Sequence, residues 1–204
     1  MATRVVLPTV STGNVPQLAL DLLIYTYGFK LVQSLDDEHL YPFAGPLDGL
    51  TLPVEQGLTT ACQLFQLNDI KLIQIRSPPL PGQKSKFIHG IKSQLKGKVL
   101  VAGSANAGMK LEDLGQLRVA EYTKDTIPDR LPESGYAVEA VKALDADAIV
   151  LFTYEGDNIA NAKELATILA QRLGLPSKPF QQPISWTRVY GKDIPTGVEQ
   201  GLYT

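Results

Sequence analysis

Residues 148–176 read "AIVLFTYEGDNIANAKELATILAQRLGLP", and this stretch decides the fold class. Its first part, 148–155, is an apolar run typical of a buried strand, and apolar residues recur at helical spacing in the rest. Asp157 or Asn158 is the expected cap of the helix, and Gly174 is its expected end. A buried strand that leads directly into an amphipathic helix is the unit from which α/β sheets are built.

The start of the chain has the same organisation. Residues 4–8 form a run rich in β-branched side chains that predicts a strand, and 15–28 predicts a helix capped by Asn14. Only Gln17 and Asp21 interrupt the apolar body of this helix. We therefore expect both of its faces to be covered, either by the core of the chain or by a partner.

The middle of the chain alternates between strand and helix signals. Two alternating segments around Asn68 and Asp69 predict a β-hairpin over 61–77. Other extended segments are expected at 30–35, 38–43, 98–104 and 117–122, further helices at 84–95 and 136–144, and a long surface loop at 123–135. Together these elements predict an α/β fold, a three-layer αβα sandwich on a mixed central sheet. We expect one such domain over residues 1–190 and a flexible tail over 191–204.

Composition and charge narrow the classes of function. The 204 residues carry a formal net charge of -2, with 44% hydrophobic and 20% charged residues. These values are typical of a globular domain and give no general electrostatic case for nucleic acid binding. The longest apolar run, 148–152, is far below the ~20 residues of a membrane-spanning helix, so no membrane association is expected. The single cysteine, Cys62, and a start without signal-peptide features favour an intracellular, cytoplasmic protein.

Candidate catalytic residues each have a structural alternative. The loop 11–14 has the position of a phosphate-binding loop but lacks its glycine and lysine spacing, and helix capping accounts for its residues. Ser104 follows a strand without the Gly-x-Ser-x-Gly pattern of a nucleophile elbow. Cys62 could pair with His39 or His89, yet it lies in an alternating strand where a small buried hydrophobe is expected.

Ligand and metal sites receive equally little support. Glu155 and Asp157 follow a predicted strand at its carboxyl end, where open α/β sheets bind ligands, but a turn and a helix cap explain them without any ligand. Two histidines and one cysteine at no recognisable spacing predict no metal site, and no cofactor is expected.

Basic residues gather on one predicted helix and at its exit. They are Lys84, Lys86, Lys92, Lys96 and Lys98. A solvated outer face is the default interpretation, and docking onto an acidic protein surface is the alternative.

Three stretches together resemble a known family. They are "LPTVSTGNVPQLALDLLI" at 7–24, "EGDNIANAKELATIL" at 155–169 and "QPISWTRVYGKD" at 182–193. They are similar to the fungal-type second subunit of the heterodimeric proteasome assembly chaperone, the proteasome assembly chaperone 2 family. The middle of the chain, 36–135, matches only as a pattern of strands and one basic helix, and it is short for the family.

The resemblance implies a binding protein rather than an enzyme. Members of this family pair with a related first subunit, and the heterodimer holds the α-subunit ring of the proteasome core during assembly and keeps regulators away until maturation. The resemblance also implies an α/β sandwich shared with archaeal homologues and similar to nucleoside phosphorylases. It implies no cofactor, and a location in the cytoplasm and also in the nucleus.

The last residues of the sequence match a hydrophobic-Tyr-X (HbYX) ending. They are Leu202, Tyr203 and Thr204. As the resemblance implies, we expect this tail to enter a pocket between two ring subunits, where the leucine and the tyrosine ring are buried and the terminal carboxylate pairs with a lysine. Such a tail binds weakly alone, so a second anchor from the body or the partner subunit is expected.

Two questions stay open at the level of sequence. The alternative function is a small α/β enzyme of the nucleoside phosphorylase or hydrolase type, with a nucleoside-like or phosphorylated ligand near Gly13, Asn14 and Glu155. The candidates for the heterodimer interface are Leu18, Leu22, Tyr25 and the region 186–190. A position in the buried core explains each of these candidates equally well.

Overall fold

The computed structural model describes residues 3–35, 37–51, 57–109 and 118–189. Its main sheet has seven strands in the order β2-β5-β6-β1-β7-β9-β8. The strands are β1 Arg4–Pro8, β2 Lys30–Ser34, β5 Cys62–Leu67, β6 Ile70–Ile75, β7 Lys98–Asn106, β8 Val119–Tyr122 and β9 Asp147–Thr153. The central pairs β6-β1, β1-β7 and β7-β9 are parallel, whereas β2-β5, β5-β6 and β8-β9 are antiparallel. The sheet is therefore mixed, as predicted.

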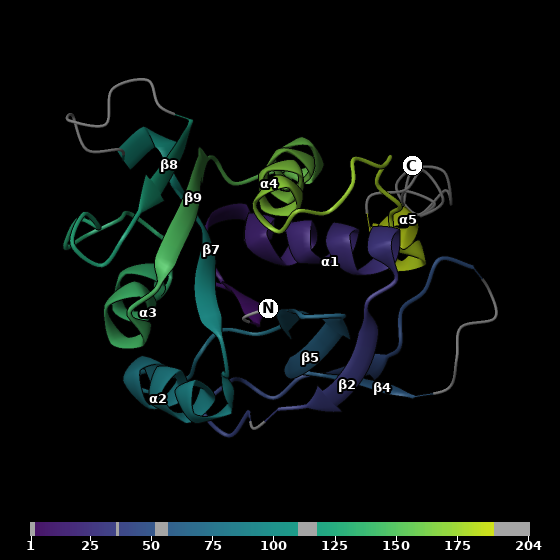
Figure 1. The fold of residues 1–204 in the computed structure, drawn as a ribbon, viewed down its shortest axis with the longest axis horizontal. Helices are drawn as coiled ribbons and strands as arrows, with labels where there is room; N and C mark the ends of the chain where they lie inside the picture. Colours follow the sequence, from purple (N-terminus) through teal and green to yellow (C-terminus); the bar gives the residue numbers. More distant parts are fainter. Residues whose placement is uncertain (1–2, 36, 52–56, 110–117, 190–204) are drawn as a thin grey trace, which may run out of the picture.

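Helices cover both faces of this sheet (Figure 1). They are α1 Val15–Tyr27, α2 Lys84–Gln94, α3 Ala137–Leu144, α4 Ile159–Arg172 and the short α5 Ile184–Val189. One hydrophobic core lies under α1 and α4, with Leu20 and Leu165 fully buried, and another lies under α2 and α3, with Ile88 and Val141 buried. The prediction of a three-layer αβα sandwich is confirmed.

Local sequence signals explain where the main elements begin and end. α1 follows a 3-10 turn at Thr12–Asn14, has Pro16 in its first turn, and ends where Gly28 takes φ 71 and donates its N–H to Ile24 O at 3.0 Å. The hairpin β5-β6 turns at Asn68, which has the left-handed φ of 52 that a tight turn requires. Both features follow the predicted pattern.

Several local predictions were wrong or incomplete. Segment 38–43 forms no strand and contributes only an isolated bridge from Leu40 to Pro79. A second sheet, β3 Ala44–Pro46 with β4 Leu58–Thr60, was not predicted because strands of three residues carry no usable alternation. Asn14 does stand at the cap position of α1, but it has φ 50 and its side chain makes no capping hydrogen bond.

The loop 123–135 is more buried than expected. It contains no helix or strand, as predicted, yet it buries Ile127 and Leu131 in the core under α2 and α3. The sequence did not indicate that these two residues are buried, because they stand among proline and polar residues and are too far apart to produce a periodic signal.

Candidate functional site

The loop before α1 lies beside the end of β9, so the structure brings together two residues of the suggested ligand site. The backbone N–H of Gly13 donates a hydrogen bond to Glu155 Oε1 at 2.9 Å. Gly13 has φ 66, and a Cβ at this position would lie 2.2 Å from Asn158 Nδ2, so the approach requires glycine. Because the carboxylate takes the N–H that a phosphate would need, this loop is filled from within the chain.

The candidate nucleophiles lie in the core. Ser104 is fully buried, and its Oγ donates a hydrogen bond to Thr12 O at 2.6 Å. Cys62 is likewise fully buried, in β5. The histidines have other contacts: His39 pairs with the adjacent glutamate, and His89 Nδ1 lies 2.7 Å from a backbone carbonyl of its own helix. A buried hydroxyl whose proton is held by a backbone carbonyl is a structural group, which agrees with the structural alternatives given above.

Metal and membrane features were also searched for. Within the described ranges, no group of three or more His, Cys, Asp or Glu side chains could hold a metal ion. In the same part of the chain, no helix combines the length and the apolar character that crossing a membrane needs.

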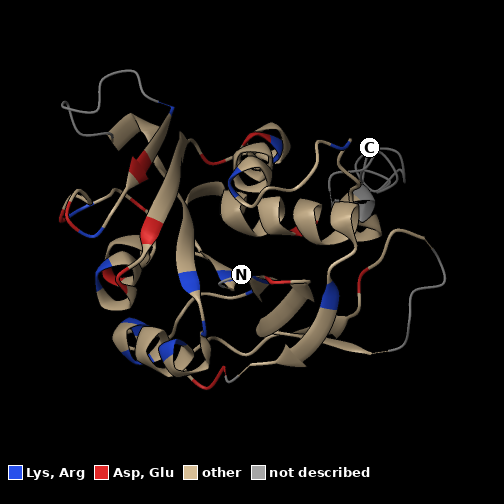
Figure 2. Cartoon of the chain, viewed as in Figure 1, with Lys and Arg blue, Asp and Glu red and all other residues tan. Residues whose placement is uncertain are grey.

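Figure 2 shows basic residues along α2. The five lysines of α2 and its exit are all exposed, and several of them contact neighbouring elements. Lys84 and Lys92 donate hydrogen bonds from Nζ to backbone carbonyls at the two ends of α3, at 3.1 and 2.7 Å. Lys98 pairs with Asp147 across β7 and β9 at 2.8 Å. Part of this positive charge therefore joins elements within the chain, which favours the default interpretation of the basic cluster.

The interface candidates on α1 belong largely to the core of the chain. Leu22 is fully buried, and Leu18 and Tyr25 are half-buried. Trp186 is 6% exposed and packs in the core under α1 and α4. Of the two interpretations, buried core is the correct one for Leu22 and Trp186.

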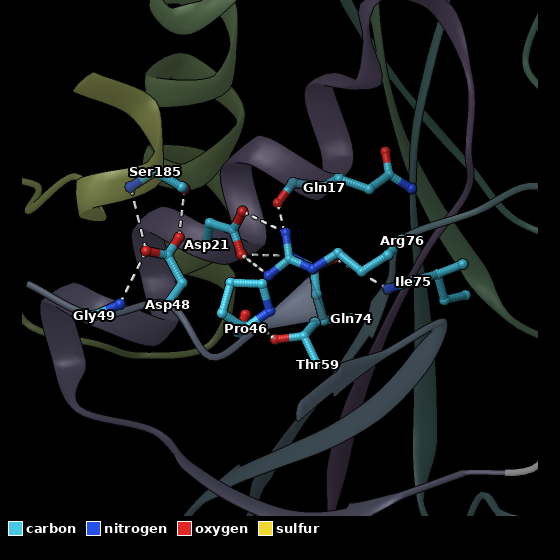
Figure 3. A network of polar contacts seen from close by, with 10 residues as sticks. All are labelled: Gln17, Asp21, Pro46, Asp48, Gly49, Thr59, Gln74, Ile75, Arg76 and Ser185. Atoms are coloured by element: carbon cyan, nitrogen blue, oxygen red, sulfur yellow. Dashed lines mark hydrogen bonds and ion pairs between the residues drawn. The ribbon is translucent and has the colours of Figure 1, made fainter. Parts of the chain in front are cut away.

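A buried ion pair joins α1 to the end of β6 (Figure 3). The two oxygens of Asp21 accept hydrogen bonds from the two terminal nitrogens of Arg76, each at 2.7 Å, and Asp21 is 3% exposed. Gln74 Nε2 donates to Asp21 Oδ1 at 2.7 Å and to Gln17 O at 2.9 Å. Sequence reasoning missed this network, although its signal was present: polar residues at i, i+4 on an apolar helix and at i, i+2 on an apolar strand.

The electrostatics of this pair favour the charged form of Arg76. Burial lowers the pKa of Arg76, but Asp21 outweighs that effect and the pKa is raised overall. Burial, and then Asp21, raise the pKa of Tyr25 on the same helix, so its hydroxyl stays protonated. A buried pair of this kind fixes the position of α1 over the sheet, because removing either partner would leave an unpaired buried charge.

A second polar cluster fixes α5, the last described element (Figure 3). Asp48 Oδ1 accepts hydrogen bonds from the N–H groups of Gly49 at 2.9 Å and Ser185 at 3.2 Å, and Asp48 Oδ2 accepts one from the Ser185 hydroxyl. Ile184 N–H donates to Gly49 O at 2.8 Å. α5 is thus held on the body at the point from which residues 190–204 follow. The predicted site residues Leu202, Tyr203 and Thr204 lie outside the described residues.

Large exposed hydrophobic side chains concentrate in one part of the described chain. Eight such residues are exposed, and six of them lie between residues 31 and 58. These six are Leu31, Val32, Tyr41, Phe43, Leu50 and Leu58. Two of them belong to β2, the outermost strand of the sheet, and two lie in or beside the small sheet β3-β4.

The sequence of this chain is similar to a known protein family and to several proteasome assembly chaperones. The model of the PAC2 family matches residues 5–98. A proteasome assembly chaperone 2 from Danio rerio is 29% identical over 243 residues, covering 93% of this chain and 92% of the relative. A proteasome assembly chaperone 2 from Saccharomyces cerevisiae is 44% identical over 45 residues, or 21% of this chain and 17% of the relative. The aligned length of 243 residues exceeds the 204 residues present here, so the zebrafish protein has segments without a counterpart in this chain.

Solved structures show that the fold is shared. PbaA of Pyrococcus furiosus, described as an archaeal homologue of proteasome-assembly chaperone, superposes with a TM-score of 0.59 at 16% identity, covering 87% of this chain and 83% of its own. A protein of unknown function from Thermoplasma acidophilum reaches a TM-score of 0.64 at 11% identity, with coverages of 87% and 79%. At these identities the likeness concerns the fold alone.

Proposed function

This chain belongs to the PAC2 family, and on that basis we propose that it is a subunit of a proteasome assembly chaperone. The observation that carries the proposal is the similarity to a proteasome assembly chaperone 2 over 93% of the chain and 92% of the relative, which is far more than one motif. The chain pairs with a related first subunit in this proposal, and the heterodimer binds the α-subunit ring of the proteasome core during assembly.

The tail is the proposed point of docking on the ring. Leu202, Tyr203 and Thr204 enter a pocket between two ring subunits, and an occupied pocket is closed to a regulator that uses the same one. Burial of the leucine and tyrosine side chains contributes ~2 kcal/mol each, against the cost of ordering the tail. The fixed position of α5 supports this proposal, because a tail that starts from a held element has a higher effective concentration at its pocket.

Two features of the structure support a binding protein over the enzyme alternative. The loop at Gly13 is filled by Glu155, so the suggested ligand position is taken by a side chain of the chain itself. Ser104 is buried and hydrogen-bonded to the backbone. The relatives that match along the chain are named as assembly chaperones.

Ring binding by a tail variant tests the proposal. The full chain is co-expressed with the first subunit, whose own tail is removed, and binding to α-ring intermediates is measured by co-purification and by titration. Tyr203→Ala should weaken binding roughly thirtyfold, because ~2 kcal/mol of apolar burial is lost. Deletion of residues 202–204 should weaken it at least as much.

A matched control shows whether the removal of another exposed tyrosine also weakens ring binding. Tyr154→Ala removes a side chain that is 65% exposed at the end of β9 and should leave ring binding unchanged. Ring binding that survives Tyr203→Ala would remove the tail from the proposal. A failure of both the ring subunits and the related subunit to co-purify with the full chain would contradict the assembly role itself.

A further inference from the structure

Asp48 and Gly49 form a dipeptide with a covalent chemistry of its own. Asp48 is the one aspartate or asparagine in the 204 residues that is followed by glycine. The two residues lie shortly after β3, in a segment without helix or strand, and both are partly exposed. In such a pair the backbone nitrogen of the glycine can attack the side-chain carboxyl group of the aspartate, because no Cβ shields that nitrogen.

The structure places the two reacting groups in contact. Gly49 N lies 2.9 Å from Asp48 Oδ1, to which it donates a hydrogen bond (Figure 3). The described glycines with a positive φ do not include Gly49, so its backbone conformation is open to other residues. Backbone strain therefore gives no reason for a glycine here, and the dipeptide combines a reactive sequence with a short distance.

The contacts of α5 hold the Asp48 carboxylate in an unreactive arrangement. Ring closure needs Asp48 Cγ, rather than an oxygen, to face the Gly49 nitrogen, and it needs a protonated carboxyl group. Ser185 donates to Oδ1 from its backbone N–H at 3.2 Å and to Oδ2 from its hydroxyl, so both oxygens are held and the negative charge is stabilised. The reaction is therefore suppressed while α5 stays docked.

α5 is an element that opens more readily than the core. It has six residues, too few for a helix that is stable alone. The contacts that hold it include those of Asp48, the hydrogen bond from Ile184 N–H to Gly49 O, and the buried ring of Trp186. Short elements of this kind open locally while the body stays folded, and each opening frees the Asp48 carboxylate.

We propose that Asp48 is a site of spontaneous conversion to isoaspartate and that docked α5 protects it. In the open state the Gly49 nitrogen bonds to Cγ of the protonated carboxyl group, the amide proton and the carboxyl hydroxyl leave as water, and a succinimide ring forms. Water then adds to one of the two ring carbonyls. Addition at Cγ restores aspartate. Addition at the backbone carbonyl carbon breaks its bond to nitrogen and leaves isoaspartate, whose backbone runs through Cβ and Cγ.

The conversion makes the release of α5 permanent. Isoaspartate has one methylene more in its backbone and one fewer in its side chain, so its carboxylate cannot meet the three donors of Gly49 and Ser185 at once. A transient opening thus becomes a lasting one, and α5, which residues 190–204 follow in the sequence, is no longer held on the body. This inference does not depend on the proposed function, because it involves only this chain and water.

Isotope labelling of the full-length chain tests the proposal. The chain is incubated for weeks at neutral pH in water enriched in oxygen-18, and peptide mapping by mass spectrometry locates the heavy oxygen and the isoaspartate. Both should accumulate at residue 48. Ser185→Ala removes the hydroxyl donor and should raise the rate there roughly tenfold, because a hydrogen bond to a charged group is lost from the docked state. Gly49→Ala shields the nitrogen with a methyl group and should reduce both signals to a small fraction of the wild-type level.

A second serine and the fluorescence of Trp186 provide the controls. Ser177→Ala removes an exposed hydroxyl from the segment between α4 and α5 and should keep the wild-type rate. The isomerised wild-type chain, separated by chromatography, should emit at longer wavelength than the unreacted chain. The proposal would be overturned by an unlabelled residue 48 in Ser185→Ala, by a wild-type rate in Ser185→Ala or Gly49→Ala, by an accelerated Ser177→Ala, or by an unshifted emission of the isomerised chain.

Discussion

Tyr136 shows how a single residue joins two layers of the molecule. It is 1% exposed, its hydroxyl donates a hydrogen bond to Pro8 O at 2.8 Å, and its ring makes an edge contact with Phe87, with ring centroids 5.7 Å apart. Burial raises the pKa of this tyrosine well above its ordinary value. The side chain thus ties the start of α3 to the end of the central strand β1, provided that it keeps its proton.

The raised pKa of Tyr136 predicts a loss of stability at alkaline pH. An unfolded tyrosine titrates near pH 10, whereas the folded side chain stays protonated, so its contribution is complete below about pH 10 and is lost as pH rises toward the folded pKa. Each pH unit in that window should cost up to ~1.4 kcal/mol of unfolding free energy. Tyr136→Phe should lower stability at pH 7 by about 1 kcal/mol, through the lost hydrogen bond, and should flatten the decline above pH 10.

Urea unfolding at pH 7 and at several values above pH 10 measures this effect. Tyr154→Phe alters a tyrosine that is 65% exposed and should keep the wild-type pH profile. If Tyr136→Phe declined as steeply as the wild type, the alkaline loss would have another origin.

Sequence reasoning predicted which residues of α1 are buried but not which residues they contact. The apolar body of α1 predicted that Gln17 and Asp21 lie on a covered helix, and both are buried. Arg76 could not be identified as the partner of Asp21, because the two are 55 positions apart and meet only when β6 passes under α1. The positions of Gly13 and Glu155 after strands suggested a shared ligand site, and only the structure shows that the two contact each other and that the carboxylate fills the loop.

Among the elements, α5 depends most on its surroundings. A helix of six residues is unstable alone, since nucleation costs more than so few hydrogen bonds return. Asp48 holds its first turn and Trp186 enters the core under α1 and α4. The sequence contains one tryptophan, so intrinsic tryptophan fluorescence reports on this element directly.

Removal of the Asp48 carboxylate should release α5 without unfolding the rest. Asp48→Ala deletes the acceptor of two backbone N–H groups and one hydroxyl, a loss of about 1.5–3 kcal/mol for hydrogen bonds to a charged group. The emission of Trp186 should shift to longer wavelength and its quenching by iodide should increase, while the far-ultraviolet circular dichroism stays close to that of the wild type.

An exposed carboxylate provides the control for this experiment. Asp129 pairs only with Lys142 in the described structure and lies on the α3 side of the sheet, so Asp129→Ala should leave the emission of Trp186 unchanged. An unchanged emission in Asp48→Ala would mean that the burial of the tryptophan ring holds α5 without the carboxylate.

At the level of elements, segments with a clear strand or helix signal were predictable and strands of three residues were not. The strands and helices at 4–28, 61–75 and 137–172 were found at nearly their observed positions, since each has several turns or alternations of signal. Segment 38–43 was expected to be extended, but Ser77 and the backbone of residues 78–80 hold it as an irregular connection. The exposure of β2 escaped prediction because a strand exposed on both faces can have the same apolar residues as a buried one.

For the whole molecule, the fold class followed from the sequence but the order of the strands did not. Alternating helices and strands with one hairpin indicate a mixed three-layer sandwich. The central position of β1 arises from pairings with β6 and β7, which lie far along the chain and leave no trace in local sequence. The same central strand contributes Val6 to one core and Leu7 to the other, so both cores share a common sheet.

This shared sheet predicts that the described body unfolds as one unit, which also tests the single domain predicted for residues 1–190. Ile88 is a buried residue of α2, in the core on the opposite face of the sheet from Trp186, and Ile88→Ala should lower the unfolding free energy by about 2–5 kcal/mol. Because β1 cannot lose one core and keep the other, the urea midpoint seen by Trp186 fluorescence should fall by the same amount as the midpoint seen by circular dichroism. Leu20→Ala, on the same face of the sheet as Trp186, should also lower the fluorescence midpoint and the circular dichroism midpoint by the same amount. If Ile88→Ala moved the circular dichroism transition and left the fluorescence transition in place, the two faces of the sheet would be separate folding units.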